Sequence, residues 1–444
     1  MTVPPTLPNV PSRFLRPRNR DVELGTSFWI VPAKLTARVL VLAIVTIALD
    51  NRLQKQYAKL PRWLKMSPSD TKTILSTLAG GSITVVALVI SLTMVVLSLV
   101  AANFGPRIIL NFVRRRTTQL AIGSFVASFV YSLLTLATVF GGTDAAFAPI
   151  LSTWTAVVLV LCATGLLVVF VQDVSSSIQI GNMLFEIAAE LDAAIRRQRR
   201  LSRRAITDSV PSPDSFGWDL VMARMTGYVQ HIDFDALVDL AKRHHAVIDL
   251  HHRAGSFLNA GRPLARVSVP FNAEALEELH TAVVVGTYRT MEQDLEYAIA
   301  EYVEIALRAL SPAVNDPATA VSCIDWIGDS LIALSAEPIA VAGFRDDHGQ
   351  DRVYLPANSL RRVVAAAFDE IRQNATGSPT VAIHMLTTIA KVSPAVHDMA
   401  ARLELRSQVE AISESATAAC TVERDRLAIH EAAAFAMDMV GPAE

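Results

Sequence analysis

The sequence predicts a mainly α-helical membrane protein, in which four transmembrane helices precede a cytoplasmic α+β region. Three observations lead to this class. Long apolar stretches fill residues 28–173, strand-like patterns cluster in residues 218–270, and helical patterns fill residues 271–444. Hydrophobic residues make up 52% of the 444 residues and charged residues only 18%, so the chain is more apolar than an average soluble protein.

Three stretches meet the length of about 20 apolar residues that a spanning helix needs. They are roughly Ile74–Ala102, Leu120–Gly141 and Ile150–Val171. A fourth stretch, Phe28–Leu49, is interrupted by Lys34 and Arg38 in its first half, where long side chains can reach the headgroups. Two interpretations stay open for it, a first span or a segment that does not cross.

The distribution of arginine predicts the orientation of these spans. Arginines occur in the N-terminal tail (residues 1–27), between the second and third spans (Arg114–Arg116) and after the fourth span (Arg196–Arg204), whereas Gly142–Pro149 has no cation. We therefore expect a bacterial inner-membrane protein with both termini in the cytoplasm, and anionic lipids at the basic flanks. The first external connection disagrees, because it is also basic; helically spaced apolar residues there predict an amphipathic helix on the outer leaflet.

Small polar residues form a stripe in the second span. Thr84, Ser91 and Ser98 recur every seven residues and therefore share one helix face. This pattern is typical of close helix packing, and it predicts a homo-oligomer if the partner helix belongs to another copy. A polar pore is the alternative.

The soluble half begins with a predicted helical stalk at residues 174–206 and a linker at residues 207–217. The β-rich module at residues 218–270 ends in GSFLNAGRPLARV (Gly255–Val267) and resembles the barrel-sandwich fold of lipoyl and biotinyl carrier domains. It lacks their modified lysine, so we expect a structural or docking version of that fold. The remainder, residues 271–444, is predicted to be a helical cytoplasmic domain without an internal repeat.

The sequence ALRALSPAVNDPATA (Ala306–Ala320) contains the densest cluster of helix-breaking residues in the chain. Ser–Pro and Asp–Pro pairs are typical of helix starts, because the first residue caps free N–H groups and proline fits the first turn. Helix caps and surface ion pairs are one interpretation of the polar residues here. The other is a ligand pocket where this stretch meets the RTxExD segment, formed by Arg289, Glu292, Asp294, Arg308, Ser311, Asn315, Asp316 and Thr319.

Catalytic and metal-binding patterns are weak. His245, Asp249 and His251 could bind zinc, but paired histidines in a polar hairpin are usually solvated. No nucleophile–base pairing or phosphate loop is visible, which favours a non-enzymatic protein without a cofactor. The three cysteines lie far apart, as in a reducing compartment, and the net charge of −2 gives no attraction to nucleic acid.

Three segments resemble bacterial membrane proteins of the domain-of-unknown-function family 2254. They are Gly81–Leu134, Gly255–Val267 and Thr287–Asp325, the last of which contains the ALSPxxNDPxTA motif. The resemblance implies a multi-pass membrane protein with a cytoplasmic C-terminal region, and implies no activity.

Three functions are consistent with this layout. The first is a channel-like or transport-associated assembly with a cytoplasmic regulatory domain. The second is a membrane-anchored ligand sensor or enzyme with a polar pocket at the SPxxNDPxT stretch. The third is a structural scaffold. The absence of charged residues deep in spans two to four counts against a proton-coupled transporter.

Overall fold

The structure is a computed structural model that describes most of the chain, namely residues 29–53, 66–104, 116–141, 148–177, 179–201, 205–206, 217–336, 341–375 and 377–442. Contacts between elements divide it into two compact units, one ending at Asn182 and the other beginning at Met183.

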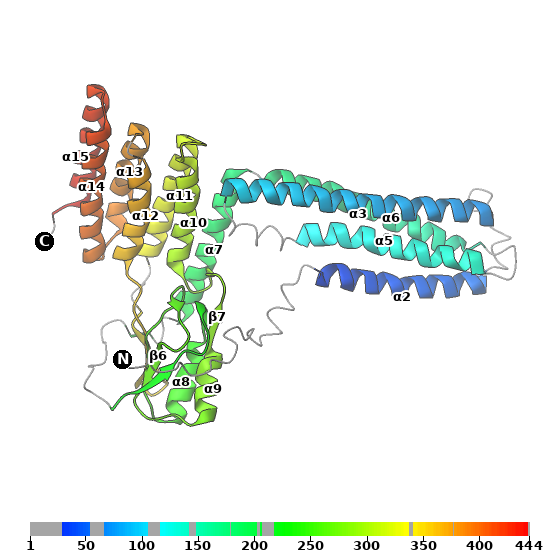
Figure 1. The fold of residues 1–444 in the computed structure, drawn as a ribbon, viewed down its shortest axis with the longest axis horizontal. Helices are drawn as coiled ribbons and strands as arrows, with labels where there is room; N and C mark the ends of the chain where they lie inside the picture. The colour runs from blue at the N-terminus through cyan, green and yellow to red at the C-terminus, as the bar shows by residue number, and fades with distance from the viewer. Residues whose placement is uncertain are drawn as a thin grey trace, which may run out of the picture. The chain divides into compact units, whose positions relative to one another are not determined.

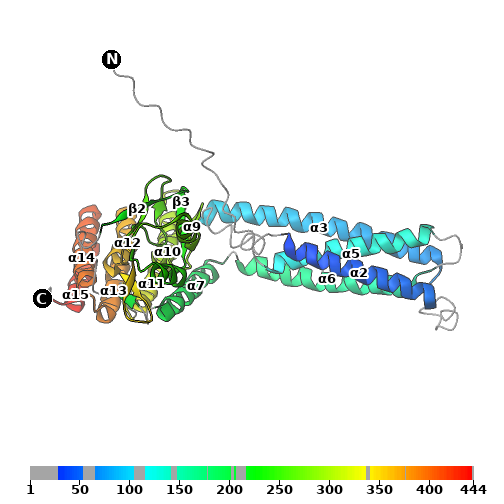
Figure 2. The same cartoon turned by 90° about the horizontal axis from the view of Figure 1, so that it is seen from below.

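The first unit is a bundle of four long helices (Figures 1 and 2). They are α2 (Ile30–Leu53), α3 (Pro68–Phe104), α5 (Arg116–Gly141) and α6 (Ile150–Ser177). Each is long and apolar enough to cross a membrane, which confirms the four expected helices. By length and composition a fifth helix, α11 (Pro317–Ser335), also qualifies, although it packs against α10 and α13 in the second unit.

The first helix of the bundle, which the sequence left in doubt, packs along α5 and α6. A methyl group at Gly123 of α5 would collide with the backbone of Pro32, and the Thr46 and Tyr131 hydroxyls are hydrogen-bonded at 2.7 Å. At the end of α2, the Asp50 carboxylate caps α6 by accepting the backbone N–H groups of Leu151 (3.0 Å) and Ser152 (2.9 Å). These contacts favour the interpretation of α2 as a span.

The predicted stalk at residues 174–206 contains the end of α6, which stops at Ser177, and a second helix, α7 (Ile180–Leu201). A run of three serines, Ser175–Ser177, ends α6, as expected for a residue type that competes with helical hydrogen bonds. In the second unit, the apolar face of α7 is buried against the other helices. The Tyr302 hydroxyl donates to the Leu184 carbonyl (3.1 Å), and Phe185 packs edge-on against Trp326.

The barrel-sandwich prediction is wrong: the β-rich part consists of two open sheets. Six strands follow the order β1-β8-β9-β4-β6-β2 and three follow β5-β3-β7. The strands are β1 (Ala205–Ile206), β2 (Asp219–Met222), β3 (Gly227–Ile232), β4 (Ile248–Leu250), β5 (Phe257–Leu258), β6 (Pro263–Val267), β7 (Val283–Gly286), β8 (Gly343–Arg345) and β9 (Asp351–Tyr354). Helices α8 (Phe234–Arg243) and α9 (Ala273–Ala282) complete this part.

The sheets differ from a closed local module because they recruit strands from beyond residue 270. β4 pairs in parallel with β9, so that Ile248 lies opposite Val353. β7 follows α9 directly, because the β-branched run Val283–Val285 favours a strand over a continued helix. Buried side chains from β3, β4, β6, α8 and α9 share one core with β8 and β9.

The remaining helices form a stack of two rows, described here as three pairs of consecutive helices (Figure 1). The helices of the first pair and of the last pair pack on each other. The pairs are α10 (Leu295–Ala309) with α11, α12 (Leu360–Asn374) with α13 (Pro379–Val392), and α14 (Met399–Ala419) with α15 (Glu423–Val440); a 3-10 turn, Ser393–Ala395, follows α13. In each pair the first helix packs on the first helix of the next pair, and the second on the second. This arrangement is that of helical repeat proteins.

Candidate functional site

The structure does not bring together the two segments of the predicted pocket, because they lie at opposite ends of α10. Asp294 precedes the first residue of this helix, and Asp316 follows its last turn. A helix of 15 residues is about 22 Å long. The two ends therefore have to be considered separately.

At the far end, the SPxxNDP stretch forms helix caps and a tight turn. Asp316 caps α11 by accepting the Thr319 backbone N–H (3.2 Å) and hydroxyl (2.6 Å), and the hydroxyl bond lowers the pKa of this carboxyl. Ser311 donates to the Arg308 carbonyl (2.7 Å), and Asn315 adopts a left-handed φ of 46°. Arg308 lies 3.4 Å from Glu304 one turn earlier on α10. These contacts fit the interpretation of the stretch as helix boundaries.

At the near end, the RTMEQD segment is fastened to strand β3. The Gln293 side chain accepts the backbone N–H of Ile232 and donates to its carbonyl, both at 2.9 Å, as a neighbouring strand would. Thr290 donates to the carbonyl of Gln230 (3.1 Å), whose side chain donates to the Tyr288 carbonyl (2.8 Å). The segment is thereby fixed before α10 begins.

Asp294, the last residue of this segment, carries a buried carboxylate that is only 1% exposed. Its Oδ2 accepts from Nε (2.7 Å) and Nη2 (2.6 Å) of Arg289, whereas Oδ1 has no hydrogen-bond partner in the described part of the chain. Burial raises the pKa of Asp294, and the Arg289 guanidinium opposes that shift. Two of the predicted ligand residues, Arg289 and Asp294, thus form an ion pair with each other.

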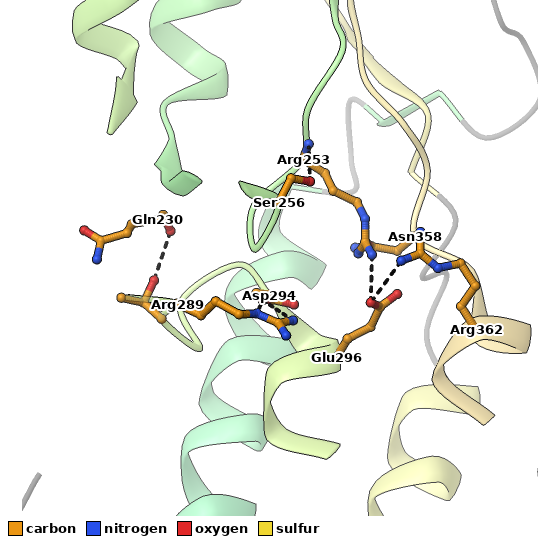
Figure 3. A network of polar contacts seen from close by, with 9 residues as sticks. Gln230, Arg253, Ser256, Arg289, Asp294, Glu296, Asn358 and Arg362 are labelled. Carbon is orange, nitrogen blue, oxygen red and sulfur yellow. Dashed lines mark hydrogen bonds and ion pairs between the residues drawn. The ribbon is translucent and has the colours of Figure 1, made fainter. Parts of the chain in front are cut away.

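A second ion pair links the loop after β4 to two helices (Figure 3). Arg253 donates to Glu296 on α10 (2.7 Å) and to Asn358 before α12 (2.6 Å), and Arg362 approaches the same Glu296 oxygen at 3.5 Å. Arg253 and Glu296 are 12% and 13% exposed, so the pair is partly shielded from solvent. Removing one partner from such a pair leaves an uncompensated charge.

Arg253 also lines a cavity of about 560 Å³ between the sheets, α7 and the start of the helical stack. Its polar lining consists of Arg196, Arg197, His231, Arg253, Glu292, Gln293 and Asn358. Its apolar lining consists of Ala193, Phe234, Ala254, Val341, Phe344 and Leu355. Three guanidinium groups and one carboxylate line the cavity. Arg253 is paired with Glu296 and Arg196 with Asp192 one turn earlier on α7, so among the described residues Arg197 is the arginine of the lining that is left to attract an anion.

The cavity has an aromatic wall and an acid–base contact. The ring centroids of Phe234 and Phe344 lie 4.3 Å apart, and the angle between the ring planes is 31°. His231 Nδ1 lies 3.5 Å from Glu292 Oε1 and has no hydrogen-bond partner among the described residues. The lining therefore offers three kinds of contact to a ligand. Its arginines can bind an anionic group, its aromatic ring can stack on a flat group, and its carboxylate can accept a hydrogen bond.

Of the predicted ligand residues, only Glu292 lines this cavity, with Arg289 and Asp294 nearby on the same segment. The other five, Arg308, Ser311, Asn315, Asp316 and Thr319, lie at the opposite end of α10. Sequence reasoning missed Arg253, His231 and Asn358 as site residues. It noted Arg196 and Arg197, but only as a basic flank for lipids.

The two weaker sets of predicted residues are placed as follows. Asp249 on β4 is bonded to Arg266 (2.7 Å), His245 has a left-handed φ of 51°, and His251 is exposed; no metal-binding cluster occurs in the described residues. On α3, Thr84, Ser91 and Ser98 are exposed within the chain. Thr84 and Ser98 donate to backbone carbonyls one turn earlier, Gly80 (2.8 Å) and Met94 (2.9 Å).

Comparison with known proteins gives the family of the chain. Residues 25–391 match the family described as predicted membrane protein (DUF2254). The chain belongs to this family. The match to DUF2254 extends over the four long apolar helices of this chain, both sheets and the first two helix pairs of the stack, so it includes every residue that lines the cavity.

The curated relatives match most of this chain and are named without an activity. An uncharacterised protein of Mycobacterium tuberculosis is 27% identical over 391 residues, which cover 84% of this chain and 73% of the relative. An uncharacterised protein of Mycobacterium bovis has the same identity and coverage. No solved structure matches the chain.

Proposed function

We propose that the protein is a membrane-anchored receptor whose soluble unit binds a small anionic ligand in the cavity at Arg253. The observation that carries this proposal is the lining itself, which contains three arginines and a histidine together with the packed rings of Phe234 and Phe344. Ligand sites are typically concave, mostly apolar and equipped with a few placed polar groups. The volume of about 560 Å³ lies within the usual range for such sites, roughly 300–1,000 Å³.

Arg253 links ligand binding to the helical stack. Its guanidinium lines the cavity and is held by Glu296 of α10 and Asn358 before α12. An anion at Arg253 competes with Glu296 for the same charge. Occupancy of the cavity therefore changes the contacts at the first two helix pairs, which is the kind of response that a sensor requires.

The membrane unit is proposed to anchor this receptor in a bacterial inner membrane, with both termini in the cytoplasm. The support is the arginine distribution together with four candidate spans. Anionic lipids are proposed partners of the basic flanks, parts of which lie outside the described residues. The amphipathic helix proposed for the first external connection also lies largely outside them.

The channel-like alternative relies on a stripe that stays exposed on α3. A pore along Thr84, Ser91 and Ser98 would have to form between copies in a homo-oligomer, because the bundle interior is filled by buried side chains around Tyr131. The hydroxyls of Thr84 and Ser98 are already bonded to their own helix. A scaffold and an enzyme remain alternatives, and the cavity supports a receptor over the scaffold.

The receptor proposal is tested by thermal unfolding of the full chain in lipid nanodiscs with inorganic phosphate, benzoate or phenyl phosphate. At 100 times Kd a ligand stabilises the native state by about 2.7 kcal/mol, which corresponds to a rise in Tm of several degrees. Arg197→Gln should reduce this rise. Arg224→Gln is the matched control, because Arg224 is exposed, pairs with Glu277 and does not line the cavity. Equal responses of both variants would place the binding elsewhere.

A further inference from the structure

We propose that the ligand is a nucleotide, whose phosphate binds the arginines of the cavity and whose base packs on Phe234. This inference rests on the receptor proposal and specifies the class of its ligand. It follows from three features of the lining, namely its arginines, its aromatic wall and Glu292, if a single ligand contacts all of them.

The cationic side of the cavity fits a phosphate. Arg196 and Arg197 come from adjacent positions on α7, and Arg253 comes from the loop after β4, so guanidinium groups reach the cavity from two elements. Arginine suits phosphate because its planar fork can bind two oxygens at once. Arg253 is oriented in advance by Glu296 and Asn358, and Arg196 is paired with Asp192 on the same helix. Among the described residues Arg197 makes no ion pair, so it is the arginine most available to a phosphate.

The aromatic side fits a flat ring. Phe344 is almost fully buried and supports Phe234, which is less buried and lines the cavity beside it. Aromatic rings prefer offset stacking, and a base on a protein ring is a common form of it. An anion without a ring, such as inorganic phosphate, would leave this wall unused.

Glu292 explains why the anion is not a simple aryl phosphate. A carboxylate among arginines opposes anion binding unless it makes a favourable contact of its own. Glu292 Oε1 lies 3.5 Å from His231 Nδ1 and the carboxylate is half exposed, so its oxygens have room to accept a hydrogen bond from a ligand. The hydroxyls of a ribose and the amino group of a base are such donors, and acidic residues bind them in other nucleotide sites.

The experiment is calorimetric titration of the full chain in nanodiscs with five probes: adenosine monophosphate, adenosine, phenyl phosphate, inorganic phosphate and benzoate. We expect adenosine monophosphate to bind at least about tenfold more tightly than inorganic phosphate or adenosine, since it alone engages all three features. Phe234→Leu keeps an apolar side chain and should weaken the nucleotide by about tenfold while leaving inorganic phosphate unchanged.

Two further variants distinguish the contribution of the arginine from that of the carboxylate. Arg197→Gln should weaken both the nucleotide and inorganic phosphate, whereas the control Arg224→Gln should weaken neither. Glu292→Gln should reduce the preference for adenosine monophosphate over phenyl phosphate, because a charged acceptor forms the stronger hydrogen bond.

The outcomes distinguish this inference from the receptor proposal. If phenyl phosphate, benzoate or inorganic phosphate binds as tightly as the nucleotide, and Arg197→Gln weakens it, the receptor proposal stands and the nucleotide is excluded as the preferred class. If none of the four anions binds, both proposals fail. A nucleotide affinity that is insensitive to Phe234→Leu and Arg197→Gln would show a site outside the cavity and overturn the inference.

Discussion

The carboxylate of Asp294 lies directly against the α-carbon of Gly255. A methyl group added at Gly255 would overlap Oδ2 of Asp294, and the φ of this glycine, 85°, is itself unfavourable for other residues. The contact ties the loop that carries Arg253 to the start of α10. It gives a physical reason for glycine at the first position of GSFLNAGRPLARV.

Gly255→Ala should therefore destabilise the soluble unit strongly. The methyl group would push Asp294 away from Arg289, and disrupting a buried ion pair costs about 3–5 kcal/mol. The matched control is Gly261→Ala. Gly261 has a similar φ of 76° but open space around it, so only the left-handed backbone penalty of about 1–2 kcal/mol applies. Thermal unfolding of both variants checks this, and equal losses would show that the contact with Asp294 does not matter.

Asp316→Asn should leave the protein close to the parent in stability. The observed role of Asp316 is to cap α11 through Thr319, and asparagine caps about as well as aspartate. Asp316→Ala should cost about 0.5–2 kcal/mol. The anion response should also persist in Asp316→Asn, because this residue lies at the far end of α10 from Glu296. Loss of that response in a stable Asp316→Asn protein would restore the functional interpretation of the stretch.

A pH-dependent contribution is expected from Asp346 in the β8–β9 turn. The bond from the Arg352 guanidinium (2.8 Å), aided by the backbone N–H groups of His348 and Gln350, lowers the pKa of Asp346 from 3.8 to about 2. A lowered carboxyl pKa stabilises the folded state fully above the unfolded value, and this contribution disappears as the pH falls through the folded value.

The measurement compares the Tm of the parent with that of Asp346→Asn. The parent should be the more stable at neutral pH, and the difference should shrink as the pH falls from about 4 to about 2. If the difference in Tm between the two proteins stays constant over this pH range, the ionised form of Asp346 does not contribute to stability.

Much of the fold could be predicted from the sequence where the signal is local. Apolar length identifies three of the four candidate spans and leaves the first one open, and the cap at Asp316 follows from its place before Pro317. The sheets could not be predicted, because β4 takes its partner β9 from about a hundred residues later and no local pattern reports such a pairing. The stack of helix pairs was also not predicted, because the three pairs occupy equivalent places in the stack but show no repeated sequence.

The candidate site was predicted only in part for the same reason. Arg289 and Asp294 are five residues apart, so their pairing is visible as neighbouring opposite charges. Arg253 is 43 residues from Glu296 and 105 from Asn358, and it stands alone in a turn-rich loop. The role of Arg253 therefore becomes visible only in the folded structure, where its distant partners lie beside it. The two charged segments do not share one pocket because α10, which is about 22 Å long, separates them.

Asp50→Ala should destabilise the membrane unit more than Asp50→Asn. Asp50 is fully buried and accepts the N–H groups of Leu151 and Ser152 together with the Ser152 hydroxyl (2.5 Å). Alanine leaves these donors without a partner, which costs about 1–3 kcal/mol for a buried group, whereas asparagine retains one acceptor. Thermal unfolding in one detergent compares the three proteins, and an Asp50→Ala protein as stable as the parent would show that the cap is dispensable.

The last prediction concerns the orientation of the bundle. Asp50 places the end of α2 at the start of α6, and the hydroxyl of Thr117 donates to Asp173 (2.5 Å), which places the start of α5 at the end of α6. Cysteines at Ala148 and Arg116 therefore lie at opposite ends of the bundle. In a Cys162→Ala background, a membrane-impermeant thiol reagent added to intact cells should label Ala148→Cys and not Arg116→Cys, because the distribution of arginine predicts a cytoplasmic location for the end that carries Arg116. The reverse pattern would invert the orientation, and labelling of both positions would contradict four antiparallel spans.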